Sequence, residues 1–195
     1  MKKGISIIAI LAVLAIIVMW GVGKYNALVG LDEGVQNGWA KVESAYQRRA
    51  DLIPNLVSTV KGYASHERET FEAVTNARAK ASQVQVDPTN ITPDQFAAFQ
   101  SAQDGLSSAL SRLLVTVERY PELKANQNFL ELQSQLEGTE NRIKVERDRF
   151  NDLVREFNVF ARRVPNNIIA ALFNFDQKEF FESAPGSDIA PVVEF

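Results

Sequence analysis

The stretch RRADLIPNLVSTVKGY, residues 48–63, decides how this chain can fold, because it places a proline and charged side chains inside a long apolar helical pattern. On both sides of it, from Val35 to Ala81, apolar residues recur at alternating steps of four and three, which is a heptad-like helical stripe. Pro54 lacks a backbone N–H and clashes with the carbonyl of Ala50, so we expect a kink or a break there.

Three charged side chains accompany this proline, and two interpretations of them stay open. Arg48, Arg49 and Asp51 lie within one helical turn, and Arg49 falls on the apolar stripe. In the functional interpretation, guanidinium groups beside a freed carbonyl hold a carboxylate of a ligand or partner. In the structural one, which we favour because no nucleophile, histidine or glycine-rich cradle lies nearby, Arg48, Arg49, Asp51 and Pro54 form a polar cluster with a buried salt bridge, for which Glu122 is a candidate partner.

Two more helical patterns follow the first. Thr92, Pro93 and Gln95 form a capping box with proline at the first helical position, which predicts a helix start there. The second stripe runs over residues 96–120 and the third over residues 129–164, and each is followed by a proline. The sequence therefore predicts an all-α fold, in which an N-terminal transmembrane helix precedes an antiparallel up-and-down bundle of three to four long helices.

The lengths of these helices raise a packing problem. The first pattern is much longer than the second, so a single rod would leave its first half without an intramolecular partner. Either the chain breaks near Pro54 and folds back as a fourth helix, or this half packs on neighbouring subunits, since its apolar residues must be covered. The residues of this candidate interface are Val35, Trp39, Val42 and Tyr46.

The first residues of the chain predict a membrane anchor. Residues 4–22 are uncharged and mostly apolar, and as a helix they span about 28 Å, close to the thickness of a hydrocarbon core. A cleaved signal peptide has a shorter apolar stretch and a small-residue cleavage site, whereas Met19 and Trp20 stand at that point, so we favour an uncleaved anchor. The candidate anchor residues within this segment are Ile5, Leu11, Ile16 and Trp20.

The charges that flank the anchor predict its orientation. Lys2 and Lys3 favour a cytoplasmic N-terminus (residues 1–3), so the bundle (residues 23–164) is expected outside the cytoplasm, on a single-pass membrane protein. The lipid bilayer is the first expected partner, and a homo-oligomer and another envelope protein are the next.

The C-terminal segment, residues 165–195, is rich in aromatic residues. Ile168, Ile169, Leu172 and Phe173 suggest a short amphipathic helix, and several phenylalanines follow it. One interpretation is an aromatic strap that closes the end of the bundle. The other is a docking surface for a neighbour, for which Phe180 and Phe181 are the candidate residues.

Composition argues against most kinds of chemistry. The chain has no cysteine and one histidine, His66, so it can build neither a thiolate metal site nor the paired histidines of zinc proteases and di-iron bundles. The part that follows the anchor is net acidic with mixed charges, which argues against nucleic acid. We therefore predict no enzyme activity, no metal and no cofactor.

Several longer motifs resemble a known family. QRRADLIPNLV, RYPELKANQNF and LEGTENRI, together with FFES near the end, are similar to the LemA family of single-pass bacterial envelope proteins, and the resemblance covers nearly the whole chain from Tyr25. It implies an N-terminal anchor, an extracytoplasmic helical bundle, no known catalytic residues, and an association with envelope homeostasis, in some members alongside membrane proteases. Asp32 departs from the basic residue that we expect in this family.

Two functions follow as hypotheses. The first is a non-enzymatic, membrane-anchored scaffold that self-associates through the stripe from Val35 to Tyr46. The second is an adaptor that regulates a membrane protease or another envelope complex through the C-terminal aromatic segment. A third, a ligand-binding or enzymatic bundle centred on Arg48 and Arg49, has the least support.

Overall fold

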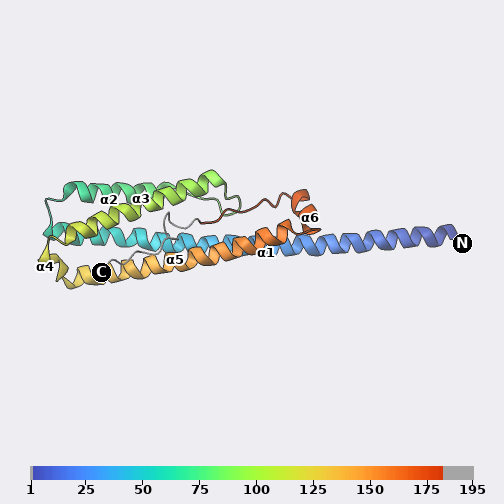
Figure 1. Cartoon of the computed structure of the whole chain (residues 1–195), viewed down its shortest axis with the longest axis horizontal. Helices are drawn as coiled ribbons and strands as arrows, with labels where there is room; N and C mark the ends of the chain where they lie inside the picture. The colour runs from blue at the N-terminus through green and yellow to red at the C-terminus, as the bar shows by residue number, and fades with distance from the viewer. Residues whose placement is uncertain (1, 182–195) are drawn as a thin grey trace, which may run out of the picture.

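The computed structural model describes residues 2–181, with side chains from residue 7 onward. Within this part the chain forms six helices: α1 (Lys2–Tyr63), α2 (Arg68–Gln83), α3 (Pro93–Val117), α4 (Pro121–Lys124), α5 (Gln127–Arg162) and α6 (Asn166–Leu172). The four long helices α1, α2, α3 and α5 run in alternating directions, as an up-and-down bundle does (Figure 1). This all-α architecture confirms the predicted fold class.

Helix α1 is one continuous helix of 62 residues that includes Pro54, so the alternative of a break at this proline is wrong. The first helical pattern is instead divided at residues 64–67, where a turn separates α1 from α2. The alternative of a fourth long helix is therefore correct in the number of helices, but this helix begins at Arg68 and not near Pro54.

The helices pair in two layers. Helix α1 lies mainly against α5, and α2 lies mainly against α3, while α4 forms the turn between α3 and α5 (Figure 1). The N-terminal part of α1 projects beyond the bundle, and α6 sits beside α1 at the end of the bundle from which that part projects.

Local signals explain where α3 and α5 begin. The Thr92 hydroxyl accepts a hydrogen bond from the Gln95 amide at 3.3 Å, and the Gln95 side chain accepts one from the Thr92 amide at 3.4 Å, which is the predicted capping box. At α5, the side chain of Asn126 accepts a hydrogen bond from the amide of Phe129.

The projecting part of α1 contains the apolar segment that is predicted to be the anchor. Among the described residues, α1 is the one helix that is long and apolar enough to cross a membrane, and its most apolar segment is exposed. Leu11, Ile16 and Trp20 all present exposed side chains there, whereas Ile5 lies in α1 with its side chain outside the described part. An exposed apolar surface of this length needs a nonpolar environment.

The half of the bundle nearest the anchor contains its own apolar core, which we call the proximal core. Its largest members come from α1, α3 and α5 and from the segment after α6: Leu28, Val35, Trp39, Val42, Tyr46, Phe96, Phe99, Phe150, Phe157 and Phe181. Trp39 has rings of Phe99, Phe150 and Phe181 within 6 Å of its own.

This packing overturns the expectation that the first half of the stripe lacks an intramolecular partner. Val35, Trp39, Val42 and Tyr46 are all buried inside the chain itself, so they do not form an exposed subunit interface. The argument from helix lengths failed because α5 is long enough to cover this half of α1, and because Phe181 returns from the C-terminal segment to fill the remaining space.

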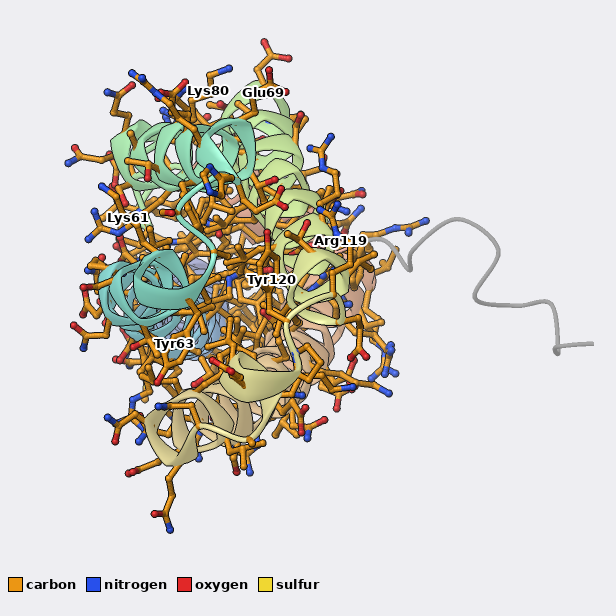
Figure 2. The ribbon with its side chains drawn as sticks, turned by 90° about the vertical axis from the view of Figure 1, so that its left-hand side faces the viewer. Lys61, Tyr63, Glu69, Lys80, Arg119 and Tyr120 are labelled. Carbon is orange, nitrogen blue, oxygen red and sulfur yellow. The ribbon has the colours of Figure 1, made fainter. Side chains whose placement is uncertain are left out.

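The far half of the bundle contains a second apolar core, the distal core. It is built from α1 to α5 and includes Ile53, Leu56, Val60, Phe71, Val74, Leu106, Leu110, Leu113, Phe129 and Leu136. At the far end, Glu67 in the α1–α2 turn accepts hydrogen bonds from Arg119 and Tyr120, each at 2.9 Å, and Asn126 donates to the Tyr63 hydroxyl. Figure 2 looks onto this end, where Tyr63, Arg119 and Tyr120 lie close to the turns.

Candidate functional site

A layer of polar side chains separates the two apolar cores, and Arg49 is its centre. Arg49 as a whole residue is 1% exposed. Its Nη1 donates to Ser107 Oγ at 2.8 Å and to Glu140 Oε1 at 2.9 Å, and its Nη2 donates to Gln103 Oε1 at 2.7 Å and to the Gln103 carbonyl at 3.3 Å. We call Arg49, Gln103, Ser107 and Glu140 the polar layer. It joins α1 to α3 and α5, and both terminal nitrogens of its buried cation donate to partners inside the chain, whereas the buried Nε has no hydrogen-bond partner among residues 2–181.

The predicted cluster around Pro54 is only partly assembled. Arg49 is buried in a salt bridge, as the structural interpretation expects, but its partner is Glu140 of α5 and not Glu122. Arg48 and Asp51 lie on the exposed face of α1, where Asp51 accepts a hydrogen bond from Gln47 at 2.8 Å. Helical spacing explains this separation, because residues adjacent in a helix point about 100° apart.

Pro54 acts through the carbonyl that it leaves free. A proline in a helix cannot donate to the carbonyl four residues earlier, which here is that of Ala50. Arg78 of α2 supplies the missing donor, and its Nε lies 2.7 Å from the Ala50 oxygen. The proline therefore creates an acceptor that holds α2 against α1, and the helix continues past it.

Two more ionisable groups are buried near the polar layer. Glu146 of α5 accepts from Arg142 at 2.7 Å and from Arg149 at 3.0 Å. Burial raises the pKa of Tyr46, whereas the neighbouring positive charges of Arg147 and Arg49 lower it. At the far end, the hydrogen bond to Glu67 raises the pKa of Tyr120. The Glu146 pairs lie within α5, whereas the Glu67–Tyr120 hydrogen bond joins the α1–α2 turn to the turn that follows α3.

The segment after α6 runs back along α5 and is held by two asparagines. Asn151 donates to the Phe181 carbonyl at 3.0 Å and accepts from the Phe181 amide at 2.8 Å. Asn158 makes the same pair of bonds with Lys178, both at 2.9 Å. We call residues 173–181 the strap, and these two side chains the asparagine pair.

The spacing of the asparagine pair matches the spacing of the strap. Asn151 and Asn158 are seven residues apart on a helix, which is about 10.5 Å. Lys178 and Phe181 are three residues apart, which is about 9–10 Å in an extended or polyproline-like segment. Each asparagine can therefore satisfy one main-chain N–H and one C=O of the strap without any strand partner.

The strap turns every third side chain inward. Phe175 and Lys178 are half-buried and Phe181 is buried, whereas the residues between them are exposed. Lys178 forms a salt bridge with Asp32 of α1, with Nζ and Oδ1 2.8 Å apart. Asp32, where the family resemblance led us to expect a basic residue, is thus one of the contacts that fix the strap.

The two candidate phenylalanines have different positions. Phe181 is a member of the proximal core and stacks on Trp39 with a centroid distance of 5.9 Å, so it is not available to a partner. Phe180 is 41% exposed on the outer side of the strap.

Sequence reasoning missed the roles of Asn151, Asn158 and Asp32. The one signal available was two polar residues seven apart near an apolar stripe, which also fits an ordinary solvent-exposed face.

Over residues 2–181 no group of three or more histidine, aspartate or glutamate side chains is arranged to hold a metal ion. The polar clusters described above join helices to each other or fix the strap. The fold and these contacts define a class of protein: a helical bundle that is continuous with one apolar helix suited to a membrane.

Comparison with known proteins identifies the family. The sequence model of the LemA family matches residues 38–195, and the chain belongs to this family. It is similar to magnetosome protein MamQ 2 of Paramagnetospirillum magneticum, with 25% identity over 206 residues that cover 97% of this chain and 74% of that protein. Protein LemA of Metamycoplasma hominis is also 25% identical, over 163 residues that cover 84% of this chain and 71% of the relative. The family and the apolar helix agree with a membrane-associated envelope protein.

Proposed function

We propose that this chain is a non-enzymatic scaffold of the bacterial envelope that holds a rigid helical bundle at a fixed position outside the plasma membrane. The observation that carries the proposal is the continuity of α1, which runs from the apolar anchor through both cores of the bundle without interruption. A single helix shared by anchor and bundle transmits position and orientation from one to the other, whereas a flexible linker would not.

The orientation in this proposal comes from charge. Lys2 and Lys3 precede the apolar segment and favour a cytoplasmic N-terminus. The bundle then lies on the opposite side, where a cysteine-free, all-helical fold is compatible with an oxidising compartment. Self-association through Val35–Tyr46 is no part of this proposal, because those residues are covered by the chain itself.

The scaffold proposal is tested by measuring how rigidly the anchor and the bundle are coupled. Since the chain has no cysteine, spin labels can be placed at Met19→Cys and Lys41→Cys alone. In lipid nanodiscs we expect a narrow distance distribution near 33 Å, the length of 22 residues of continuous helix. Gly23→Pro should broaden it and Gly23→Ala should not, because a Cβ at Gly23 meets no heavy atom within 4 Å. A broad distribution in the unmodified chain would contradict a rigid scaffold.

A second candidate function, an adaptor for another envelope complex, is supported by Phe180. The neighbouring Phe181 main chain is fixed by Asn151, so the exposed Phe180 ring is presented in a defined position. A photo-crosslinking residue at position 180 should then form a discrete adduct with one membrane protein in intact membranes. The same residue at Val115, which is exposed near the C-terminal end of α3, is the control. If position 180 forms no adduct, the adaptor function is contradicted.

A further inference from the structure

The end of the bundle nearest the anchor presents four large apolar side chains to the surroundings. Val164 is 80% exposed, Leu172 69%, Ile168 62% and Phe173 50%. They lie within ten residues of sequence on and beside α6, whereas exposed apolar residues elsewhere on the bundle, such as Val115 and Leu130, occur singly. Single exposed apolar residues are ordinary, but a cluster of this kind usually marks a surface with an apolar partner.

The position of α6 identifies that partner. The other side of α6 packs on α1 at the point where the apolar anchor ends. A Cβ on Gly21 would lie 3.8 Å from Cδ1 of Ile169, and the rings of Tyr25 and Phe173 are 4.7 Å apart. Figure 1 shows α6 at the end of the bundle from which the anchor projects. The four exposed side chains therefore continue the exposed apolar surface of α1.

The charges around α6 also suit a lipid surface. Arg162 and Arg163 directly precede the cluster and are exposed, and Lys24 lies two residues beyond the apolar segment 4–22, with its ammonium 5.6 Å from the centroid of the Phe160 ring. From residue 162 to residue 175 the sequence has no acidic side chain. Apolar and aromatic residues flanked by cations are the composition that the interface between hydrocarbon and phospholipid headgroups favours.

We propose that α6 is a second membrane contact, in which Val164, Ile168, Leu172 and Phe173 enter the outer interface of the same bilayer that α1 crosses. Arg162 and Arg163 then lie at the level of the phospholipid phosphates. The inference rests on the proposed anchoring by α1 and adds to it, because a continuous helix fixes the bundle relative to α1 but leaves α1 itself free to rotate and tilt in the bilayer. Two contacts fix which side of the bundle faces the membrane, and hence the direction in which Phe180 and the strap point.

The test uses the full-length, cysteine-free chain in phosphatidylglycerol-containing nanodiscs. A single nitroxide label is introduced by Ile168→Cys or Leu172→Cys, and its accessibility to oxygen and to a water-soluble nickel chelate is compared. Ile16→Cys reports the anchor, and Val115→Cys reports an exposed site near the C-terminal end of α3. These positions are exposed, so labelling requires no repacking of the core.

We compare the ratio of each label's accessibility to oxygen and to the nickel chelate. At positions 168 and 172 we expect this ratio to be several-fold higher than at position 115 and lower than at position 16. The label at Asn167→Cys, on the flank of α6, should give a smaller ratio than that at 168. If the labels at positions 168 and 172 give the same ratio as the label at position 115, while the label at position 16 is protected from nickel, the proposed α6 contact is wrong and the anchoring by α1 is retained. If the label at position 16 also gives the same ratio as that at position 115, the anchoring itself is wrong. Dipolar coupling between labels at 168 in different molecules would mean that a second copy covers α6, which would overturn the lipid contact.

Discussion

At the scale of single residues, Arg49 illustrates what a charge within an apolar stripe can do. Its guanidinium lies between the proximal and distal cores and donates to acceptors on α3 and α5. An apolar residue at this position would allow the two cores to merge and neighbouring helices to slide by one turn. A buried polar group that finds partners in one register only disfavours such alternatives. The structural interpretation of the sequence is therefore supported, with a different partner.

Arg49→Met is expected to destabilise the bundle by about 2–3 kcal/mol, because it leaves the buried Gln103 oxygen without a donor. Arg48→Met is the matched control, and its exposed position predicts a change within about 0.5 kcal/mol. Urea unfolding followed by circular dichroism measures both. In Arg49→Met with Gln103→Leu, part of the stability should return, since an apolar replacement of a buried polar group is often neutral. Equal effects of the two arginine substitutions would contradict the role given to Arg49.

At the scale of elements, α1 was the hardest to predict. Periodicity showed that residues 35–81 are helical, but the stripe continues in register through residues 64–67, where the structure has a turn. The proline that suggests a break lies inside α1, because Arg78 satisfies the carbonyl that the proline exposes. The chain instead turns between Tyr63 and Arg68, and Glu67 in this turn accepts hydrogen bonds from Arg119 and Tyr120, some 50 residues later. No local rule of sequence contains those bonds.

The link between Pro54 and Arg78 predicts a coupled pair of substitutions. In the unmodified chain, Arg78→Met should cost about 1–2 kcal/mol, because the Ala50 carbonyl loses its donor. In a Pro54→Ala background the helix supplies its own donor, so the same substitution should cost less than about 0.5 kcal/mol. Pro54→Ala alone is expected to stabilise α1, by up to about 3 kcal/mol. Arg68→Met, at an exposed pair with Glu72, is the control. Additive effects of the Pro54 and Arg78 substitutions would refute this link.

At the scale of the whole molecule, the structure is two apolar cores joined by a polar layer, with the strap closing the proximal core. Phe181 contributes a ring to that core, and the asparagine pair and Asp32 fix the main chain and Lys178 beside it. The distal core contains no part of the strap. The two halves therefore depend on the C-terminal segment to different extents.

Asn151→Ala combined with Asn158→Ala should release the strap selectively. We expect amide hydrogen exchange at Lys178 and Phe181 to accelerate by at least about tenfold, because two hydrogen bonds to each residue are lost. Trp39 should become more exposed, whereas amides around Leu110 and Leu113 in the distal core should keep their protection. Asn167→Ala, on the exposed side of α6, controls for loss of an asparagine. Unchanged exchange in the strap would show that Phe181 packing alone holds it.

The sequence by itself determined the helical class, the apolar N-terminal helix, the start of α3 and the family resemblance. These follow from periodicity, composition and capping, which are properties of neighbouring residues. The tertiary structure decided the partner of Arg49, 91 residues away in sequence, the turn at residues 64–67 and the burial of Val35 to Tyr46 beneath α5 and the strap. An apolar stripe shows that a surface must be covered, but several segments can cover it, and only their joint packing selects one.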